Sequence, residues 1–194
     1  MKIIQIVLNL YPFVGFVILA IINHKFFKMK KLLFIALFLF LPYLNAQESN
    51  VLVTTDDEKS KSILAAYDSY LVNEYDWSDK LFSPQILIYI NSVKSISKEE
   101  NIAGLSSHHN LFSDISMLSP DGGKPYVQTT NYNSNIGIWS HAWFIWKGTG
   151  KATGKTIEVP CHVAYQWNEN GKISQTWLFS DQAPLIAEIN AASK

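Results

Sequence analysis

The chain of 194 residues has no arginine and a single cysteine, Cys161. Without arginine there is no planar guanidinium fork to hold phosphate or guanine through two parallel hydrogen bonds, which argues against nucleic acid as a partner. A lone cysteine excludes both a disulfide within the chain and a cysteine-based metal cluster. We therefore expect no nucleic-acid partner, and the sequence indicates no metal and no cofactor.

Long apolar runs are confined to residues 1–46, at 3–22 and 32–44, with a basic patch at 25–31 between them. From Met29 the order is a positively charged start, an apolar core and a small residue, which is the plan of a secretory signal peptide. The pattern predicts an exported protein, periplasmic or extracellular.

Met29 is the predicted initiator, so residues 29–46 form the predicted signal peptide, with cleavage between Ala46 and Gln47. Residues 1–28 are then an upstream extension of the reading frame. The alternative is a membrane anchor, because about 20 apolar residues are enough to span a bilayer. Contact with a membrane is expected only through such an uncleaved N-terminal segment.

The rest of the chain is acidic. Five of the 16 lysines and none of the 16 acidic residues lie in residues 1–46, which leaves residues 47–194 with a formal net charge of −5. A chain of about 150 residues fits one domain with one core. We predict an exported tail at 47–55 and a single domain at 56–194.

Two capping-box patterns predict helices in the first half of this domain. Thr55-x-x-Glu58 precedes apolar residues at helical spacing and predicts a helix over about 56–73. A short second helix or turn is expected at 75–82, ended by Pro84. Ser97-x-x-Glu100 opens a further helix, on whose apolar face His109 is the polar exception.

Five β-rich runs are predicted as strands, at 86–90, 126–132, 136–147, 155–167 and 172–180. Polar and apolar residues alternate along 155–167, which indicates one core face and one wet face. In 136–147 both faces are apolar, so we expect the outer face of the sheet to meet a second subunit. Ser180 and Asp181 are predicted to cap a last helix, with Pro184 in its first turn.

Five segments carry a resemblance to a known family, namely Trp146–Gly150, Thr153–Lys155, Val163–Trp167, Asn170–Ile173, and Trp177 with Asp181 four places later. Together with the order of elements, they resemble the SnoaL-like members of the nuclear-transport-factor-2-like superfamily. The resemblance implies an α+β cone, in which a curved antiparallel sheet wraps around N-terminal helices. It also implies an apolar pocket and a homodimer through the sheet. The N-terminal export segment indicated by residues 1–46 precedes this domain. The function stays open, because this fold hosts several enzyme classes and plain binding domains.

Two acids of the related enzymes are missing. SnoaL-type cyclases and limonene-epoxide-hydrolase-like members carry an acid in the last strand, where this chain has Leu178. Ketosteroid-isomerase-like members carry an aspartate base at the end of the first strand, where this chain has Ile90 and Asn91. Leucine and isoleucine cannot transfer a proton, so neither catalytic set is complete.

His109 is the best acid/base candidate, because a histidine on the core face of a helix would point into the cone. The alternative is a satisfied core histidine with His108 in solvent. Asp181 is the other catalytic candidate, or else the N-cap of the last helix, worth about 1 kcal/mol. His141 is placed either in the cavity or at the dimer sheet, and His162 is expected to face outward.

Seven residues are the candidate ligand contacts, and Trp177 among them is expected in the core: Tyr67, Trp77, Tyr89, His109, Trp143, Tyr165 and Trp177. The preferred function is binding of a small apolar or aromatic molecule, with no identifiable catalytic set. The alternative is a cofactor-free isomerase, cyclase or hydrolase that uses His109 with Asp181 or a tyrosine hydroxyl. A histidine within about 3 Å of a second polar group at the cavity floor would favour the enzyme. A purely structural dimer would have no cavity large enough for a ligand.

Overall fold

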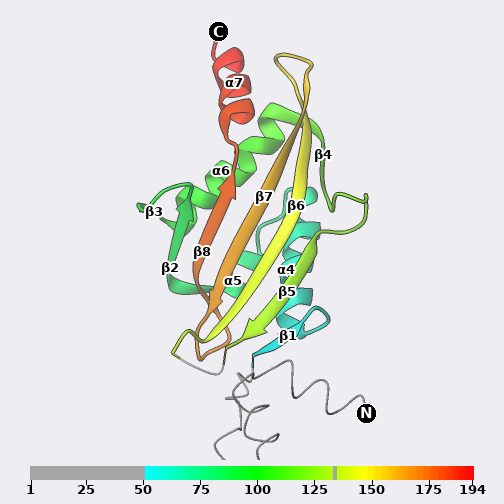
Figure 1. The fold of residues 1–194 in the computed structure, drawn as a ribbon. Helices are drawn as coiled ribbons and strands as arrows, with labels where there is room; N and C mark the ends of the chain where they lie inside the picture. The colour runs from blue at the N-terminus through cyan, green and yellow to red at the C-terminus, as the bar shows by residue number, and fades with distance from the viewer. Residues whose placement is uncertain (1–50, 133–134) are drawn as a thin grey trace, which may run out of the picture. The chain divides into compact units, whose positions relative to one another are not determined.

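The computed structural model describes residues 51–132 and 135–194 (Figure 1). The predicted extension at 1–28, the signal peptide at 29–46 and residues 47–50 of the tail therefore lie outside the described residues. Across the two described ranges, no helix combines the length and the apolar character needed to cross a bilayer.

The described residues contain four helices: α4 (Glu58–Leu71), α5 (Trp77–Leu81), α6 (Lys98–Leu111) and α7 (Ala183–Ala192). The capping box before α6 is confirmed, since the Ser97 hydroxyl accepts from the Glu100 N–H at 3.1 Å and the Glu100 carboxylate accepts from the Ser97 N–H at 2.7 Å.

The predicted cap of α4 is wrong. The N-cap of this helix is Asp57, whose carboxylate accepts from the N–H groups of Lys59 at 2.9 Å and Ser60 at 3.1 Å. A carboxylate at this position also interacts favourably with the positive end of the helix dipole, which favours Asp57 over Thr55.

Eight strands form one sheet within the described residues: β1 (Leu52–Thr54), β2 (Phe82–Ile90), β3 (Ser95–Ile96), β4 (Phe112–Leu118), β5 (Tyr126–Asn131), β6 (Ile138–Gly150), β7 (Thr156–Trp167) and β8 (Ile173–Ser180). Their order is β1-β5-β6-β7-β8-β2-β3, with β4 also paired to β6. All pairs are antiparallel except β2 with β8, which is parallel. Figure 1 shows α4 and α6 behind the long strands β6 and β7. The α+β class with a curved sheet over the helices is as expected.

Three strands, β1, β3 and β4, were not expected from the sequence. Residues 52–54, assigned to a tail, pair with β5 as strand β1. Strand β4 contains a register shift and a left-handed Asp114 at φ 53°, so its apolar alternation is interrupted.

Pro84 does not stop β2 from starting at Phe82, because it lies where the pairing with β8 is irregular and its missing N–H is not needed.

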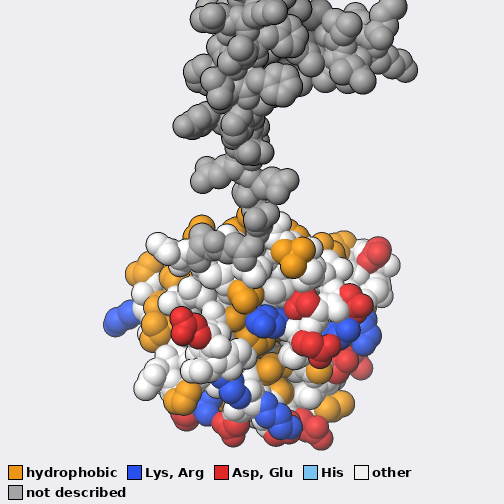
Figure 2. Space-filling model, turned by 90° about the horizontal axis from the view of Figure 1, so that it is seen from below, with side chains coloured by type: hydrophobic (Ala, Val, Ile, Leu, Met, Phe, Trp, Pro, Cys, Tyr) orange, Lys and Arg blue, Asp and Glu red, His pale blue; other side chains and the backbone are white. Residues whose placement is uncertain are grey.

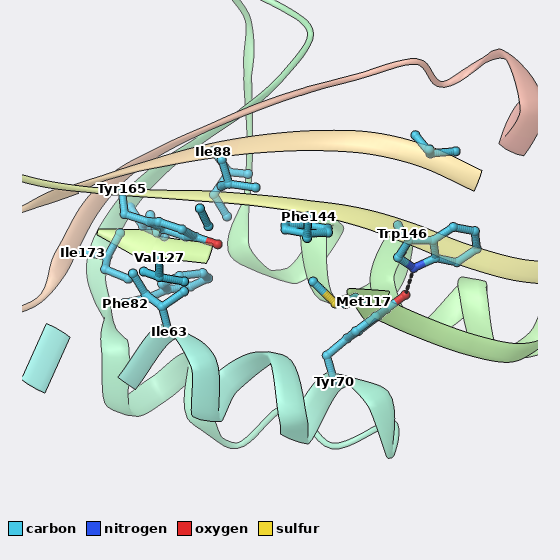
Figure 3. Close-up of a cluster of buried hydrophobic side chains, with 14 of the residues drawn as sticks. Ile63, Tyr70, Phe82, Ile88, Met117, Val127, Phe144, Trp146, Tyr165 and Ile173 are labelled. Atoms are coloured by element: carbon cyan, nitrogen blue, oxygen red, sulfur yellow. Dashed lines mark hydrogen bonds between the residues drawn. The ribbon is translucent and has the colours of Figure 1, made fainter. Parts of the chain in front are cut away.

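The two faces of β6 have different surroundings. Even-numbered residues from Ser140 to Gly150 are buried on the inner face, whereas odd-numbered ones keep exposed surface on the outer face. The inner face packs on α4, so that Tyr70 of that helix faces Trp146, while Ile63 lies beside Phe82 and Val127 (Figure 3).

A chain of hydrogen bonds crosses the core between the sheet and α4. The indole N–H of Trp167 donates to the Ser140 hydroxyl at 2.8 Å, and the hydroxyl groups of Ser140 and Thr129 are 2.7 Å apart. The Ser60 hydroxyl follows at 2.9 Å and donates to the Asp57 carboxylate at 2.7 Å. An indole only donates and a carboxylate only accepts, so every hydroxyl in the chain accepts once and donates once. The chain fixes the start of α4 on the sheet.

The surface charges are mixed. On the face seen in Figure 2, lysines and acidic side chains alternate with scattered apolar groups, and the face carries no continuous basic patch. This arrangement does not favour binding of a polyanion at that face.

Candidate functional site

A cavity of about 140 Å³ lies between the inner face of the sheet and the helices. Its walls come from all four described helices and from β2, β4, β6, β7 and β8. Most of the lining is apolar or aromatic, and no lysine, aspartate or glutamate of the described residues contributes to it. A dry apolar cavity of about 150 Å³ can hold a benzene-sized molecule, so this cavity is large enough for a small ring.

Two tyrosine hydroxyls form the first polar group in the cavity wall. Tyr67 of α4 and Tyr165 of β7 both line the cavity, and their hydroxyl oxygens are 2.7 Å apart. Burial raises the pKa of both phenols well above the ordinary value, so both stay neutral. Tyr67 also packs edge-on against Phe144, which holds its ring in place.

The second polar group is a chain of three side chains. The indole N–H of Trp146 donates to the Tyr70 hydroxyl at 2.8 Å, as the dashed line in Figure 3 marks. The Tyr70 oxygen lies 3.0 Å from Nδ1 of His108, which lines the cavity. Burial, together with the neighbouring His109, lowers the pKa of His108 to about 4, so the ring is neutral at physiological pH. The arrangement that uses every proton has Tyr70 donating to Nδ1, which leaves the proton of His108 on Nε2.

His109 does not line the cavity, in contrast to the expectation from sequence. The cavity face of α6 consists of Asn101, Leu105 and His108, a helical spacing as regular as the one through His109. The ring of His109 instead packs edge-on against the ring of Tyr70, with their centroids 5.1 Å apart. Its Nε2 is buried and has no hydrogen-bond partner among the described residues.

Asp181 lies outside the cavity lining and is exposed. Its carboxylate accepts from the Ala183 N–H at 2.9 Å at the start of α7. The N-cap of α7 is nevertheless Gln182, which makes no side-chain capping bond, so the expectation that Asp181 is the N-cap is wrong by one residue. His109 and Asp181 are therefore not brought together at the cavity.

The candidate ligand contacts divide between the two faces of the sheet. Tyr67, Trp77 and Tyr165 line the cavity. Tyr89, Trp143 and Trp177 do not, because their positions on β2, β6 and β8 belong to the outer face. The expectation that Trp177 is a core residue is therefore wrong. Its ring stacks on the ring of Tyr89, with the two ring centroids 3.9 Å apart.

The outer face carries a row of rings from four neighbouring strands. Tyr126, Trp143, His162 and Phe179 are direct cross-strand partners, with ring centroids 5.6, 5.0 and 6.1 Å apart along the row. His141 joins it through Nδ1, 3.1 Å from Nε2 of His162. Burial lowers the pKa of both histidines, and for His141 the proximity of His162 adds to the effect.

The two positions of the missing acids do line the cavity. Leu178 and Ile90 both contribute to its wall, each with an apolar side chain. Within the described residues no group of three or more histidine, cysteine, aspartate or glutamate side chains is arranged to hold a metal ion.

Tyr70 and Trp146 were not among the candidate site residues, and His108 was considered only as the neighbour of His109. Tyr70 shows in the sequence only as part of an apolar helical pattern, and Trp146 only as an apolar position in β6. In the sequence Tyr70 is 38 positions from His108 and 76 positions from Trp146, so no local pattern can reveal the hydrogen bonds among them.

The sequence matches no family model and no curated protein. Solved structures do resemble this one. IdmH from Streptomyces antibioticus, a proposed polyketide cyclase, is 14% identical over 69% of this chain and 99% of its own, with a TM-score of 0.51. AclR from Streptomyces galilaeus, a proposed hydroxylase, is 13% identical over 69% of this chain and 85% of its own, with a TM-score of 0.53. AusH from Aspergillus nidulans is 18% identical over 66% of this chain and 87% of its own, with a TM-score of 0.50. At these identities the likeness is one of fold, and it confirms the fold expected from the sequence.

Proposed function

We propose that this chain, which has the SnoaL-like cone fold of the nuclear-transport-factor-2-like superfamily, binds a small apolar or aromatic molecule in its cavity without an identifiable catalytic set. The observation that carries the proposal is the cavity of about 140 Å³, walled mainly by apolar and aromatic side chains and free of charged ones. Burial of apolar surface supplies the binding free energy, at about 25 cal/mol per Å².

A pair of alanine substitutions on α4 tests this proposal. Ala66 is buried and lines the cavity, so Ala66→Leu fills part of it, whereas the neighbouring Ala65 is exposed and Ala65→Leu changes only the surface. Ethylbenzene titrated calorimetrically is expected to bind the wild type and Ala65→Leu alike and Ala66→Leu at least tenfold more weakly. Equal binding by all three proteins, or binding by none, would contradict the proposal.

The enzyme alternative is favoured by one observation, the 3.0 Å contact between His108 and Tyr70 in the cavity wall. It meets the geometric criterion for a cofactor-free isomerase, cyclase or hydrolase, with His108 in place of His109 and with the expected tyrosine hydroxyl as its partner. Against it, Nδ1 of His108 is occupied and the pKa of about 4 makes the ring a weak base.

Deuterium exchange distinguishes the two functions. Acetophenone incubated with the protein in D₂O reports proton transfer at the carbon beside its carbonyl. The binding proposal expects exchange at the background rate. Exchange well above background in the wild type, lost in His108→Phe, would favour the enzyme.

Export and dimerisation are part of the same proposal. We expect cleavage between Ala46 and Gln47, which the mass of exported protein would show; a mature N-terminus upstream of Met29 would instead support the membrane anchor.

A homodimer through the outer face of the sheet would cover Phe179, which is 52% exposed in the single chain. Phe179→Glu is expected to shift sedimentation toward the monomer. Ile186→Glu on α7, equally exposed at 52%, is expected to leave it unchanged. A wild-type monomer would refute the dimer.

A further inference from the structure

The hydroxyl groups of Tyr67 and Tyr165 hold one proton more than they use. Each phenol has one O–H, and the 2.7 Å contact between them uses only one of the two protons. Neither hydroxyl makes another hydrogen bond within residues 51–132 and 135–194. Burial keeps both phenols protonated, because it raises the pKa of each. The second proton is therefore a donor without an acceptor in an apolar wall, where such a group is costly.

His108 presents a second unused donor. Its Nδ1 takes the Tyr70 proton, while Tyr70 accepts from the indole of Trp146, so the ring proton stays on Nε2. That N–H has no acceptor in the described part of the chain. Because His108 lines the cavity, the cavity wall holds spare donors on both sides, from α6 and from the α4–β7 pair.

The remaining polar lining does not supply a matching charge or a dedicated acceptor. Asn101, Thr176, Ser180 and Gln182 also line the cavity, and each of these side chains can both donate and accept. Within residues 51–132 and 135–194 no lysine, aspartate or glutamate lines the cavity, so a charged ligand would lose its hydration with no counter-ion from this part of the chain.

We propose that the cavity selects a neutral apolar molecule that carries a hydrogen-bond acceptor oxygen, such as a ketone, an ester or an ether, placed at the Tyr67–Tyr165 hydroxyl pair. This proposal rests on the proposed binding function, and adds to it the chemical class of the ligand. The acceptor takes the spare phenol proton and thereby satisfies the donor that the empty cavity leaves unpaired. Charged molecules of the same size, such as benzoate or benzylamine in its ammonium form, are excluded.

Acetophenone and ethylbenzene test the proposal, because they match in shape and differ mainly in the carbonyl oxygen. Their dissociation constants are measured calorimetrically for the purified full-length protein and for Tyr67→Phe/Tyr165→Phe, which removes both hydroxyls. Tyr126→Phe is the matched control, since Tyr126 lies on the outer face, is 48% exposed and, among the described residues, donates its hydroxyl hydrogen bond to Gln128 alone. The measured quantity is the ratio of the acetophenone to the ethylbenzene dissociation constant.

The double variant is expected to raise this ratio about tenfold, with little change for ethylbenzene, because only the ketone loses a hydrogen bond. Either single variant, Tyr67→Phe or Tyr165→Phe, is expected to raise it about threefold, because one phenol can still donate. Tyr126→Phe should leave the ratio unchanged.

An unchanged ratio in the folded double variant, or in both single variants if the double variant does not fold, would overturn the assignment of the ligand class and leave the binding function standing. If neither ethylbenzene nor acetophenone binds the wild type, that result would instead overturn the binding function itself.

Discussion

Replacing Ser140 by alanine tests whether the buried hydrogen-bond chain holds the sheet and α4 together. Ser140 has no exposed surface, and its hydroxyl accepts from Trp167 and contacts Thr129. Alanine differs from serine only by that oxygen, so the substitution opens almost no cavity and the effect is one of hydrogen bonding.

The magnitude follows from the groups left without a partner. Ser140→Ala leaves the buried indole N–H of Trp167 without its acceptor, and an unpaired buried donor costs about 1–3 kcal/mol. Thr129 keeps its bond to Ser60, so the rest of the chain to Asp57 survives. The free energy of unfolding is therefore expected to fall by about 1–3 kcal/mol.

Urea unfolding followed by tryptophan fluorescence gives this value. Ser107→Ala is the control, since in the described part of the chain the Ser107 hydroxyl donates only to the carbonyl of the exposed Gly104. The loss of unfolding free energy on this substitution should stay within about 0.5 kcal/mol. In the background of Trp167→Phe, which has no N–H to orphan, Ser140→Ala should cost about 1 kcal/mol less than it does alone. If Ser140→Ala is no more destabilising than Ser107→Ala, the reasoning about the chain is wrong.

Three further outcomes are expected. Burial raises the pKa of Asp57, but hydrogen bonds led by the Ser60 hydroxyl outweigh this effect and lower it from 3.8 to about 2. Asp57 therefore adds about 1 kcal/mol, after solvent screening, to the free energy of unfolding above pH 4, and this contribution is lost between pH 4 and 2. An acid titration in which the unfolding free energy of Asp57→Asn falls as steeply with pH as that of the wild type in this range would contradict this. Gly150→Ala should destabilise by about 1–3 kcal/mol, because its Cβ would push the buried Glu188 carboxylate away from its bonds to the Ala152 N–H and the Thr153 hydroxyl. Gly104→Ala on open α6 should be neutral or stabilising in the same melt. Trp177→Ala should cost less than about 2 kcal/mol in urea unfolding, since the ring lies on the outer face; a cost of about 4 kcal/mol would place it in the core instead.

The sequence was sufficient for the fold because its signals there are local. The Ser97 capping box and the alternation along β7 are read within a few residues, and the structure has both. The short edge strands β1 and β3 were missed because two or three residues carry no periodicity.

The site was predicted less well because it depends on which residue of a close pair turns inward. His108 and His109 lie on equally plausible faces of α6, and only the packing of that helix selects His108. Trp143 and Trp177 are aromatic residues in core strands, yet their parity places them outside. A period of two identifies opposite faces, but not which of two apolar faces is the inner one.

Native mass spectrometry of the protein purified from its own host tests the central claim, that the cavity binds a small neutral molecule. The account predicts the chain with the additional mass of one small organic molecule, and loss of that mass in Ala66→Leu but not in Ala65→Leu. A bare chain in all three proteins, or stoichiometric zinc or iron in place of an organic molecule, would contradict it.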